Sequence, residues 1–246
     1  MQPLTAQVKP SPESTDSKKE QVEQMFDDIS GRYDLLNRLL SFGVDVGWRK
    51  KVRRKIEASG AERLLDVATG TADMAIELSR LPALKEIIGV DISAGMLRVG
   101  DKKIARKSLN HKIRLMQADS ESLPFEDNSF DACTVCFGVR NFEHLEAGMK
   151  EMARVLKPGG KLIVLEFSRP RSAVFRQLYW FYFGKVLPFL CRIISGSSNA
   201  YRYLPASVKA FPDGSDFTTI MKNCGCSEAT AEPLTFGICT LYTGTR

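Results

Sequence analysis

Apolar and amphipathic segments alternate along most of this chain. Short apolar runs, typical of strands buried on both faces of a parallel sheet, occur at 63–67, 86–91, 113–117, 130–137 and 161–166. Segments with apolar residues at helical spacing lie between these runs, at 74–78, 95–107 and 145–156. A helix at 216–223 follows, and two further strands at 228–233 and 238–243 flank Phe236-Gly237. The pattern predicts an α/β fold with a mostly parallel, seven-stranded sheet, helices on both faces and an antiparallel C-terminal hairpin.

The N-terminal part of the chain precedes this alternation. Residues 1–20 contain prolines, serines and little apolar content, which predicts a flexible tail, and we expect residues 21–246 to form a single domain. Residues 21–60 have apolar positions at helical spacing, and their last helix, Arg49 to Ile56, is basic and ends near Gly60. This basic helix either contacts phosphate or lipid or presents a solvated face.

An aromatic and basic insertion interrupts the alternation at about 169–212. It carries Trp180 among other aromatic residues, together with arginines and lysines, and Gly184 and Pro188 make it a poor membrane span. Aromatic and basic residues are favoured at lipid interfaces. We therefore expect either an apolar lid whose outer face rests on a membrane or an ordinary helix that covers the sheet.

Composition narrows the location and the chemistry. The 246 residues, with 43% hydrophobic content, suffice for one domain and a tail. The net charge of +6 favours anionic surfaces but does not separate nucleic acid from lipid headgroups. Because there is no signal peptide and no apolar run of about 18 residues, we expect a cytoplasmic protein. Cys133 and Cys136 fall on opposite faces of a strand, and Cys224-Gly225-Cys226 is too tight for ordinary zinc pairing, so we expect no metal site.

A run of small residues joins the first strand to the next helix. The segment 63–73 ends in Ala68-Thr69-Gly70-Thr71-Ala72, and small side chains let the backbone approach a ligand near the unpaired N–H groups of a helix start. Alanines stand here where glycines are common, so a plain structural turn is the alternative. Asp91 ends the second strand about 20 residues further on, a spacing that suits a carboxylate binding ribose hydroxyls.

Polar residues also follow the third and fourth strands. Asp119, just past the third strand, either recognises the exocyclic amine of adenine or caps a helix. Arg140 and Asn141 follow the fourth strand. Because ligands of open α/β sheets bind beyond the carboxyl ends of the strands, both side chains should point into the cleft.

Three segments give the chain a family resemblance. They are Tyr33-Asp34-Leu35-Leu36-Asn37, Phe137-Gly138-Val139-Arg140-Asn141 and the run from Arg154 to Ser168. On these segments the chain, from about Gln21 to its C-terminus, resembles the menaquinone and ubiquinone C-methyltransferases, which are class I S-adenosylmethionine-dependent methyltransferases with a Rossmann-like fold. The resemblance implies S-adenosylmethionine as co-substrate, no metal, and C-methylation of demethylmenaquinol, with the ubiquinone-pathway benzoquinol or another small molecule as alternatives. Asp45, where ubiquinone-type members carry histidine, favours the menaquinone precursor.

The resemblance also implies a set of cofactor-binding residues. The set consists of Tyr33, Gly70, Thr71, Asp91, Asp119, Ser120 and Cys136. Thr71 and the glycine loop would contact the methionine part of S-adenosylmethionine. Asp91 would bind the ribose, and Asp119 with Ser120 the adenine. Cys136 stands where some members carry serine.

The implied reaction assigns roles to polar residues near the strand ends. A ring carbon of a quinol becomes a nucleophile when a neighbouring hydroxyl, with a pKa of about 10, loses its proton, and a cation within about 4 to 6 Å lowers that pKa by roughly 1 to 3 units. Arg140 is expected to supply that cation and Asn141 to orient the hydroxyl. Asp73 either receives the proton, directly or through water, or satisfies backbone N–H groups at a helix start. His111 and His144 are expected at the surface rather than in catalysis.

Partners follow from the same reasoning. The implied substrate is a lipophilic, prenylated quinol, so we expect peripheral contact with the inner face of the cytoplasmic membrane. The chain has no recognisable RNA-binding appendage, so nucleic acid is not an expected partner, and a homodimer is compatible with the sequence. A nicotinamide dehydrogenase shares the strand, loop and distal acid but does not explain the terminal hairpin. A binding protein without activity is disfavoured by the intact set of polar residues at the strand ends.

Overall fold

One mixed sheet forms the centre of the protein. The computed structural model describes residues 8–41, 43–172, 175, 177, 181 and 199–246. Within these residues the strands form a seven-stranded sheet in the order β3-β2-β1-β4-β5-β7-β6. The strands are β1 (Arg63–Val67), β2 (Glu86–Asp91), β3 (Ile113–Gln117), β4 (Phe130–Cys136), β5 (Leu156–Phe167), β6 (Glu228–Leu234) and β7 (Cys239–Thr245). Strands β1 to β5 run parallel, whereas β7 runs antiparallel to β5 and β6, which confirms the predicted sheet with its C-terminal hairpin.

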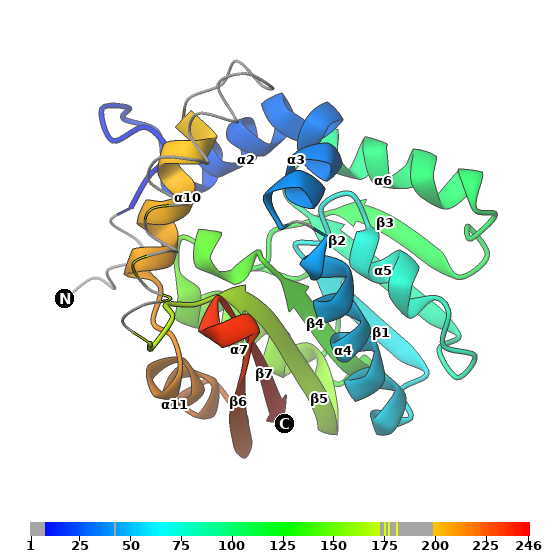
Figure 1. Ribbon diagram of the computed structural model, residues 1–246. Coiled ribbons are helices and arrows are strands. Elements are labelled where there is room, and N and C mark those ends of the chain that lie inside the picture. The colour runs from blue at the N-terminus through cyan, green and yellow to red at the C-terminus, as the bar shows by residue number, and fades with distance from the viewer. Residues whose placement is uncertain (1–7, 42, 173–174, 176, 178–180, 182–198) are drawn as a thin grey trace.

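Helices cover both faces of this sheet. One face carries α4 (Val44–Ser59), α5 (Asp73–Leu78) and α6 (Ala94–Arg106), and the other carries α7 (Leu145–Val155) and α11 (Ser215–Asn223) (Figure 1). Side chains of a strand alternate between its faces, so Leu64 packs in the core beneath α4 and α5 while Leu65 packs beneath α7 and α11. Cys133 and Cys136 pack on opposite faces for the same reason, as predicted.

A third buried cluster closes the carboxyl end of the sheet. It joins α2 (Lys18–Ile29), α6 and α10 (Asn199–Ala210), and it includes Val22 and Tyr203. Figure 1 shows α2 and α3 (Tyr33–Leu40) together at this end of the sheet, with α10 beside them. Short 3₁₀ helices lie at η1 (Ser30–Arg32), η2 (Val139–Asn141) and η4 (Thr235–Gly237). The cluster therefore places α2 and α10 next to the strand ends where a ligand is expected.

The N-terminal boundary differs from the prediction. Helix α2 begins at Lys18 rather than Gln21. Ser17 caps it, because the Ser17 hydroxyl accepts a hydrogen bond from the Glu20 N–H while the Glu20 carboxylate accepts one from the Ser17 N–H. Lys18 is fully buried. The predicted tail of residues 1–20 is therefore too long, and its last three residues belong to the folded part.

Two other predicted boundaries need adjustment. Helix α4 begins at Val44 rather than at Arg49. It ends as expected near Gly60, whose φ of +65° is the left-handed conformation that glycine adopts readily at a helix C-terminus. The strand predicted at 161–166 is longer, because β5 already begins at Leu156 and includes residues 157–160. Its backbone forms hydrogen bonds with the backbone of the C-terminal Arg246, which a local sequence pattern does not show.

Basic side chains of α4 pair with carboxylates on neighbouring elements. Lys51 Nζ lies 2.6 Å from Glu232 Oε1 on β6, and Arg53 Nε lies 3.2 Å from Glu77 Oε1 on α5. These pairs favour a role in docking α4 over a face that is free to bind phosphate or lipid.

Most of the predicted insertion at about 169–212, including Trp180, lies outside the described residues. Its C-terminal part forms α10. In the part of the chain that the structure describes, no helix combines the length and the apolar character needed to cross a bilayer.

Candidate active site

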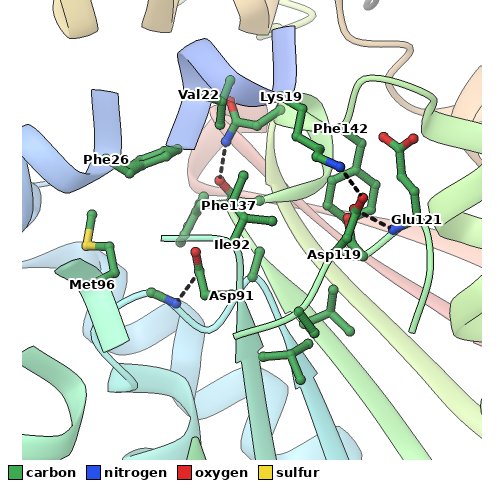
Figure 2. A pocket seen from close by; sticks show the side chains of 18 of the residues that line it. Lys19, Val22, Phe26, Asp91, Ile92, Met96, Asp119, Glu121, Phe137 and Phe142 are labelled. Carbon is green, nitrogen blue, oxygen red and sulfur yellow. Dashed lines mark hydrogen bonds and ion pairs between the residues drawn. The ribbon is translucent and has the colours of Figure 1, made fainter. Parts of the chain in front are cut away.

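A pocket opens at the carboxyl ends of the central strands (Figure 2). It holds about 690 Å³ of empty space, part of it open to solvent, which is within the size range of small-molecule and cofactor sites. Val22 and Phe26 of α2 lie across the pocket from the end of β2. The predicted site residues that line it are Tyr33, Gly70, Asp91, Asp119, Ser120, Cys136 and Asn141. Thr71, Asp73 and Arg140 are not among its lining residues.

The loop after β1 has an unusual backbone. Ala68, Gly70 and Ala72 have φ values of +50°, +56° and +63°. This left-handed conformation is inexpensive for glycine but costs other residues roughly 1 to 2 kcal/mol. Strain of this kind is common at ligand sites, where the surrounding structure maintains it. The two alanines thus adopt a backbone conformation that glycine would adopt at less cost.

Buried Asp66 fixes this loop. Its two carboxylate oxygens accept hydrogen bonds from Thr69 Oγ1 at 2.7 Å and from Thr134 Oγ1 at 2.6 Å. Burial raises the pKa of Asp66 to about 6, although the two hydroxyls partly offset that effect. On the other side of the loop, a Cβ at Gly138 would lie only 2.4 Å from the Ala68 Cβ. The close approach of the two backbones therefore requires glycine at 138.

Asp91 joins the end of β2 to the same loop. Its Oδ2 accepts a hydrogen bond from Gly70 N at 2.8 Å (Figure 2), and its Oδ1 accepts one from Ser93 N at 2.9 Å. Burial raises the pKa of Asp91 to about 6, while these N–H groups favour the ionised form. Each carboxylate oxygen can accept more than one hydrogen bond, so Asp91 retains capacity for ligand hydroxyls.

Asp119 lies in a turn after β3. Residues 118–129 contain no helix, so the alternative role of Asp119 as a helix cap is wrong. Its Oδ1 accepts a hydrogen bond from Glu121 N at 2.9 Å, and its Oδ2 pairs with Lys19 Nζ at 2.7 Å. Figure 2 shows this pair joining α2 to the turn. Helix α2 and the turn thus enclose one end of the pocket.

An ion-pair network engages Thr71 and Asp73. Thr71 Oγ1 donates to Asp34 Oδ1 at 2.5 Å and accepts from Lys103 Nζ at 3.1 Å. Asp73 pairs with the same Lys103, and its Oδ2 lies 3.7 Å from Arg49 Nη2. The contacts join α3, α4, α5 and α6. Both side chains are engaged in this network, so the cofactor contact of Thr71 and the base role of Asp73 stay predictions, and its pairing with Lys103 makes Asp73 a weaker candidate for a base.

The remaining predicted residues fall into two groups. Tyr33 and Cys136 line the pocket as neutral groups, because burial raises the pKa of the Tyr33 hydroxyl and raises that of the Cys136 thiol well above its ordinary value. The Tyr33 ring packs edge-on against Phe26, with 6.0 Å between ring centres. His111 and His144 are exposed, as predicted.

Arg140 and Asn141 occupy η2, directly after β4, and both are buried. Arg140 Nη1 donates to Glu166 Oε1 at 2.8 Å and to the Phe137 carbonyl, and its guanidinium lies 5.5 Å from the centre of the Phe167 ring. Burial lowers the pKa of Arg140, but Glu166, together with Tyr203 and Tyr33, more than offsets this and the net pKa is raised. The predicted cation is thus paired with a buried carboxylate, and its role in catalysis stays a prediction. The Arg140 Nε is buried and has no hydrogen-bond partner.

A model of the ubiE/COQ5 methyltransferase family matches residues 14–246. The chain belongs to this family of methyltransferases. The demethylmenaquinone methyltransferase of Bacteroides fragilis is 45% identical over 241 residues, which cover 98% of each chain. The ubiquinone/menaquinone biosynthesis C-methyltransferase UbiE of Geotalea daltonii is 46% identical over 230 residues, covering 93% of this chain and 97% of that protein. A solved SAM-dependent methyltransferase of Thermotoga maritima shares the fold, with a TM-score of 0.58 at 19% identity, covering 91% of this chain and 98% of that one.

Two features of this methyltransferase site were missed by sequence reasoning. Glu166, the partner of the catalytic candidate Arg140, follows the apolar run 162–165, and a charged residue at the end of a buried strand was an available signal. Lys18 fell in the predicted tail, although the pattern Ser17-x-x-Glu20 is a capping-box signature that predicts a helix start. Within the described residues, no three His, Cys, Asp or Glu side chains are grouped as in a metal site.

Proposed function

We propose that the protein uses S-adenosylmethionine to methylate a ring carbon of demethylmenaquinol. The names of two relatives with about 45% identity over nearly the whole chain support this substrate class. The observation that carries the proposal is the pocket itself. Its lining runs from Asp91 and Asp119 to Asn141, which adjoins the buried Arg140, so a nucleoside-containing cofactor and a ring acceptor can meet in one cavity.

The pocket lining fits an adenosine-containing cofactor. Asp91 would accept hydrogen bonds from the ribose hydroxyls, because its carboxylate lies at the end of β2 and faces the pocket. Asp119 would accept a hydrogen bond from the adenine amine, with Ser120 beside it. In the structure this carboxylate is paired with Lys19. The Lys19 side chain is nearly half-exposed, and breaking such an exposed ion pair costs little. Gly70, Tyr33 and Cys136 line other parts of the cavity.

The residues of the chain would prepare the acceptor ring for methyl transfer. When bound, S-adenosylmethionine supplies an electrophilic methyl group. A ring hydroxyl ordinarily ionises with a pKa of about 10, and hydrogen bonds to its oxygen favour the ionised form, in which the ring carbon is the better nucleophile. In this proposal the Arg140 Nε–H and the Asn141 amide would bind that oxygen, because Arg140 Nε lacks a partner and Asn141 lines the pocket. Because Glu166 neutralises Arg140, directed hydrogen bonds rather than a free positive charge would supply the stabilisation.

Proton release completes the proposed reaction. The acceptor exchanges one ring hydrogen for a methyl group, so one proton leaves overall. With Asp73 held by Lys103, the proton would pass to water at the open side of the pocket. Phe137 and Phe142 are apolar residues of the pocket lining and would keep water from the reacting carbon.

We also propose peripheral contact with the cytoplasmic face of the membrane, where a prenylated quinol resides. Phe181 and Phe236 support this, since their side chains are 63% and 68% exposed and Phe236 stacks on Phe175 at 4.1 Å between ring centres. Co-sedimentation with anionic liposomes should retain the wild-type protein and lose at least half of it after Phe236→Ser. Absence of the wild-type protein from the pellet would contradict the proposal.

An acceptor panel tests the proposed substrate. The protein is incubated with S-adenosylmethionine and with reduced demethylmenaquinone, the reduced ubiquinone-pathway benzoquinone or catechol, and the products are identified by mass spectrometry. We expect the naphthoquinol to be methylated fastest. The benzoquinol is a second candidate substrate, because the name of the Geotalea relative includes both ubiquinone and menaquinone biosynthesis. If the benzoquinol is methylated faster, it becomes the assigned substrate. Methylation of catechol alone would contradict both.

A further inference from the structure

Three buried polar atoms beside the pocket lack a hydrogen-bond partner. They are Arg140 Nε, Asn141 Oδ1 and Tyr203 Oη. Their residues are only 7%, 7% and 4% exposed. Nearly all buried polar atoms in folded proteins have a partner, and leaving one unpaired is destabilising. Three such atoms in one region of the fold therefore point to a missing ligand.

The three residues come from two elements that pack together. Arg140 and Asn141 are consecutive in η2, and α10, which carries Tyr203, packs against η2. Tyr203 also belongs to the buried cluster of Val22 and Met96, and both of these residues line the pocket. Asn141 thus lines the pocket, Arg140 is its neighbour in η2, and Tyr203 packs in one cluster with two of the lining residues.

The chemistry of the three atoms matches one hydroxyl oxygen. Burial raises the pKa of Tyr203 well above its ordinary value, and the charge of Arg140 only partly offsets this, so the Tyr203 hydroxyl keeps its proton and acts as a donor. Arg140 Nε–H is a second donor. Asn141 Oδ1 is an acceptor, and its orientation agrees with the contact of 3.5 Å from Asn141 Nδ2 to the Phe137 carbonyl.

The rest of the Arg140 side chain is held in place by other groups. Glu166 Oε1 and the Phe137 carbonyl both accept hydrogen bonds from Nη1. This arrangement fixes the direction of the Nε–H. A neutral hydroxyl could accept from both donors and donate to Asn141, and after loss of its proton the two donors would still stabilise the oxygen.

We propose that Tyr203 is a catalytic residue that donates a hydrogen bond to a ring hydroxyl oxygen of the aromatic acceptor, at a site completed by Arg140 and Asn141. The inference rests on the proposed function and adds to it the group that binds the reacting ring through its oxygen. It assigns a role to α10, which belongs to the region between β5 and the terminal hairpin.

Tyr203→Phe tests this role because it removes the hydroxyl alone. We expect kcat to fall by between about tenfold and a thousandfold, as for loss of one donor to a developing oxyanion, with a smaller change in KM. In the ligand-free protein the same substitution removes an unpartnered buried hydroxyl, so Tm should rise by about 2 to 4 °C. A structural hydrogen bond would give the opposite shift in Tm, and a fall in Tm would overturn the proposal.

Tyr242→Phe is the matched control. Tyr242 is also fully buried, but its Oη accepts a hydrogen bond from Gly214 N at 2.9 Å, and it lies on β7 outside the pocket lining. We expect this variant to lower Tm and to leave kcat unchanged. The shift in Tm should therefore have opposite signs in the two variants, and the loss of kcat should be large only in Tyr203→Phe. Equal losses of kcat would overturn the assignment, because they would mean that any buried tyrosine hydroxyl has this effect.

A binding measurement separates this inference from the proposed function. Calorimetry with 1-naphthol, in the presence of S-adenosylhomocysteine, should show binding at least about tenfold weaker in Tyr203→Phe than in wild type. Naphthalene, which has no oxygen, should bind both proteins equally. If wild type does not methylate demethylmenaquinol but the 1-naphthol difference is found, the proposed substrate fails and the oxygen site stands. Equal 1-naphthol affinity, or a kcat that Tyr203→Phe leaves within about threefold of wild type, overturns the role of Tyr203.

Discussion

Lys18 is a buried cation that docks α2 beside the pocket. Its Nζ donates to the Arg140 carbonyl at 3.1 Å and to the Phe142 carbonyl at 2.8 Å, and the side chain is fully buried. The pKa of Lys18 is lowered from 10.5 to about 8, mainly by burial and to a smaller extent by the charge of Arg140. The charges of Glu143 and Glu121 partly offset this effect. We predict that Lys18→Met changes the pH dependence of stability more than stability at neutral pH.

The expected magnitude follows from the two pKa values. At neutral pH the buried ammonium costs about 3 kcal/mol, but Lys18→Met also leaves two carbonyls without this donor, at about 1 to 3 kcal/mol each, so the net change is small. The folded pKa lies below the unfolded one, so between about pH 8 and 10.5 the unfolded state binds more protons and stability rises with pH. Between about pH 7 and pH 9 the free energy of unfolding of the wild type should rise by about 1.3 kcal/mol more than that of Lys18→Met.

Urea unfolding followed by circular dichroism at both pH values measures this difference, provided that the m values agree. The titrations of other groups cancel because the two proteins share them. Lys85→Met is the matched control, since the Lys85 side chain is 71% exposed, and it should follow the wild type. If wild type and Lys18→Met gain stability equally with pH, to within about 0.3 kcal/mol, Lys18 does not titrate in this range and its buried, carbonyl-bound position is refuted.

Three further substitutions test other parts of the site. Glu166→Gln should lower the free energy of unfolding by about 3 to 5 kcal/mol, because it leaves Arg140 buried without a counterion, and a change below about 1 kcal/mol in urea unfolding would count against the buried pair. Gly138→Ala places a Cβ 2.4 Å from the Ala68 Cβ and so disturbs the close approach of the two backbones. Calorimetry should show S-adenosylhomocysteine binding at least about tenfold weaker. Unchanged affinity would mean that this close approach does not shape the pocket. Asp73→Asn should keep kcat within about threefold of wild type in the methyl-transfer assay, whereas a loss of about a hundredfold or more would support the base role.

Local patterns were sufficient to predict the sheet. Both bounds of β2 and of β3 match the apolar runs at 86–91 and 113–117, because strands buried on both faces are continuous hydrophobic segments. The position of Asp91 and Asn141 in the pocket follows from the same information, since residues that end parallel strands gather at one edge of a sheet.

The partners of the charged side chains were not predictable in this way. Glu166 lies 26 residues from Arg140, and their contact depends on the parallel register of β4 and β5. Asp73 is held by Lys103, 30 residues away, only because α6 packs beside the start of α5. Lys18 has the composition of an exposed residue, yet it is buried because two carbonyls near η2 accept its hydrogen bonds. Each of these contacts depends on tertiary packing, which the spacing of apolar residues does not specify.

The most direct test of the proposed function is the identity of the methylated atom. Reduced demethylmenaquinone is incubated with the protein and with S-adenosylmethionine that carries an isotopically labelled methyl group, and the product is analysed by nuclear magnetic resonance. We predict that the label appears as a methyl group bonded to a ring carbon, and that the product is heavier than the substrate by the labelled methyl group less one hydrogen. A label bonded to a ring oxygen, or no labelled naphthoquinol while another acceptor is methylated, would contradict C-methylation of demethylmenaquinol.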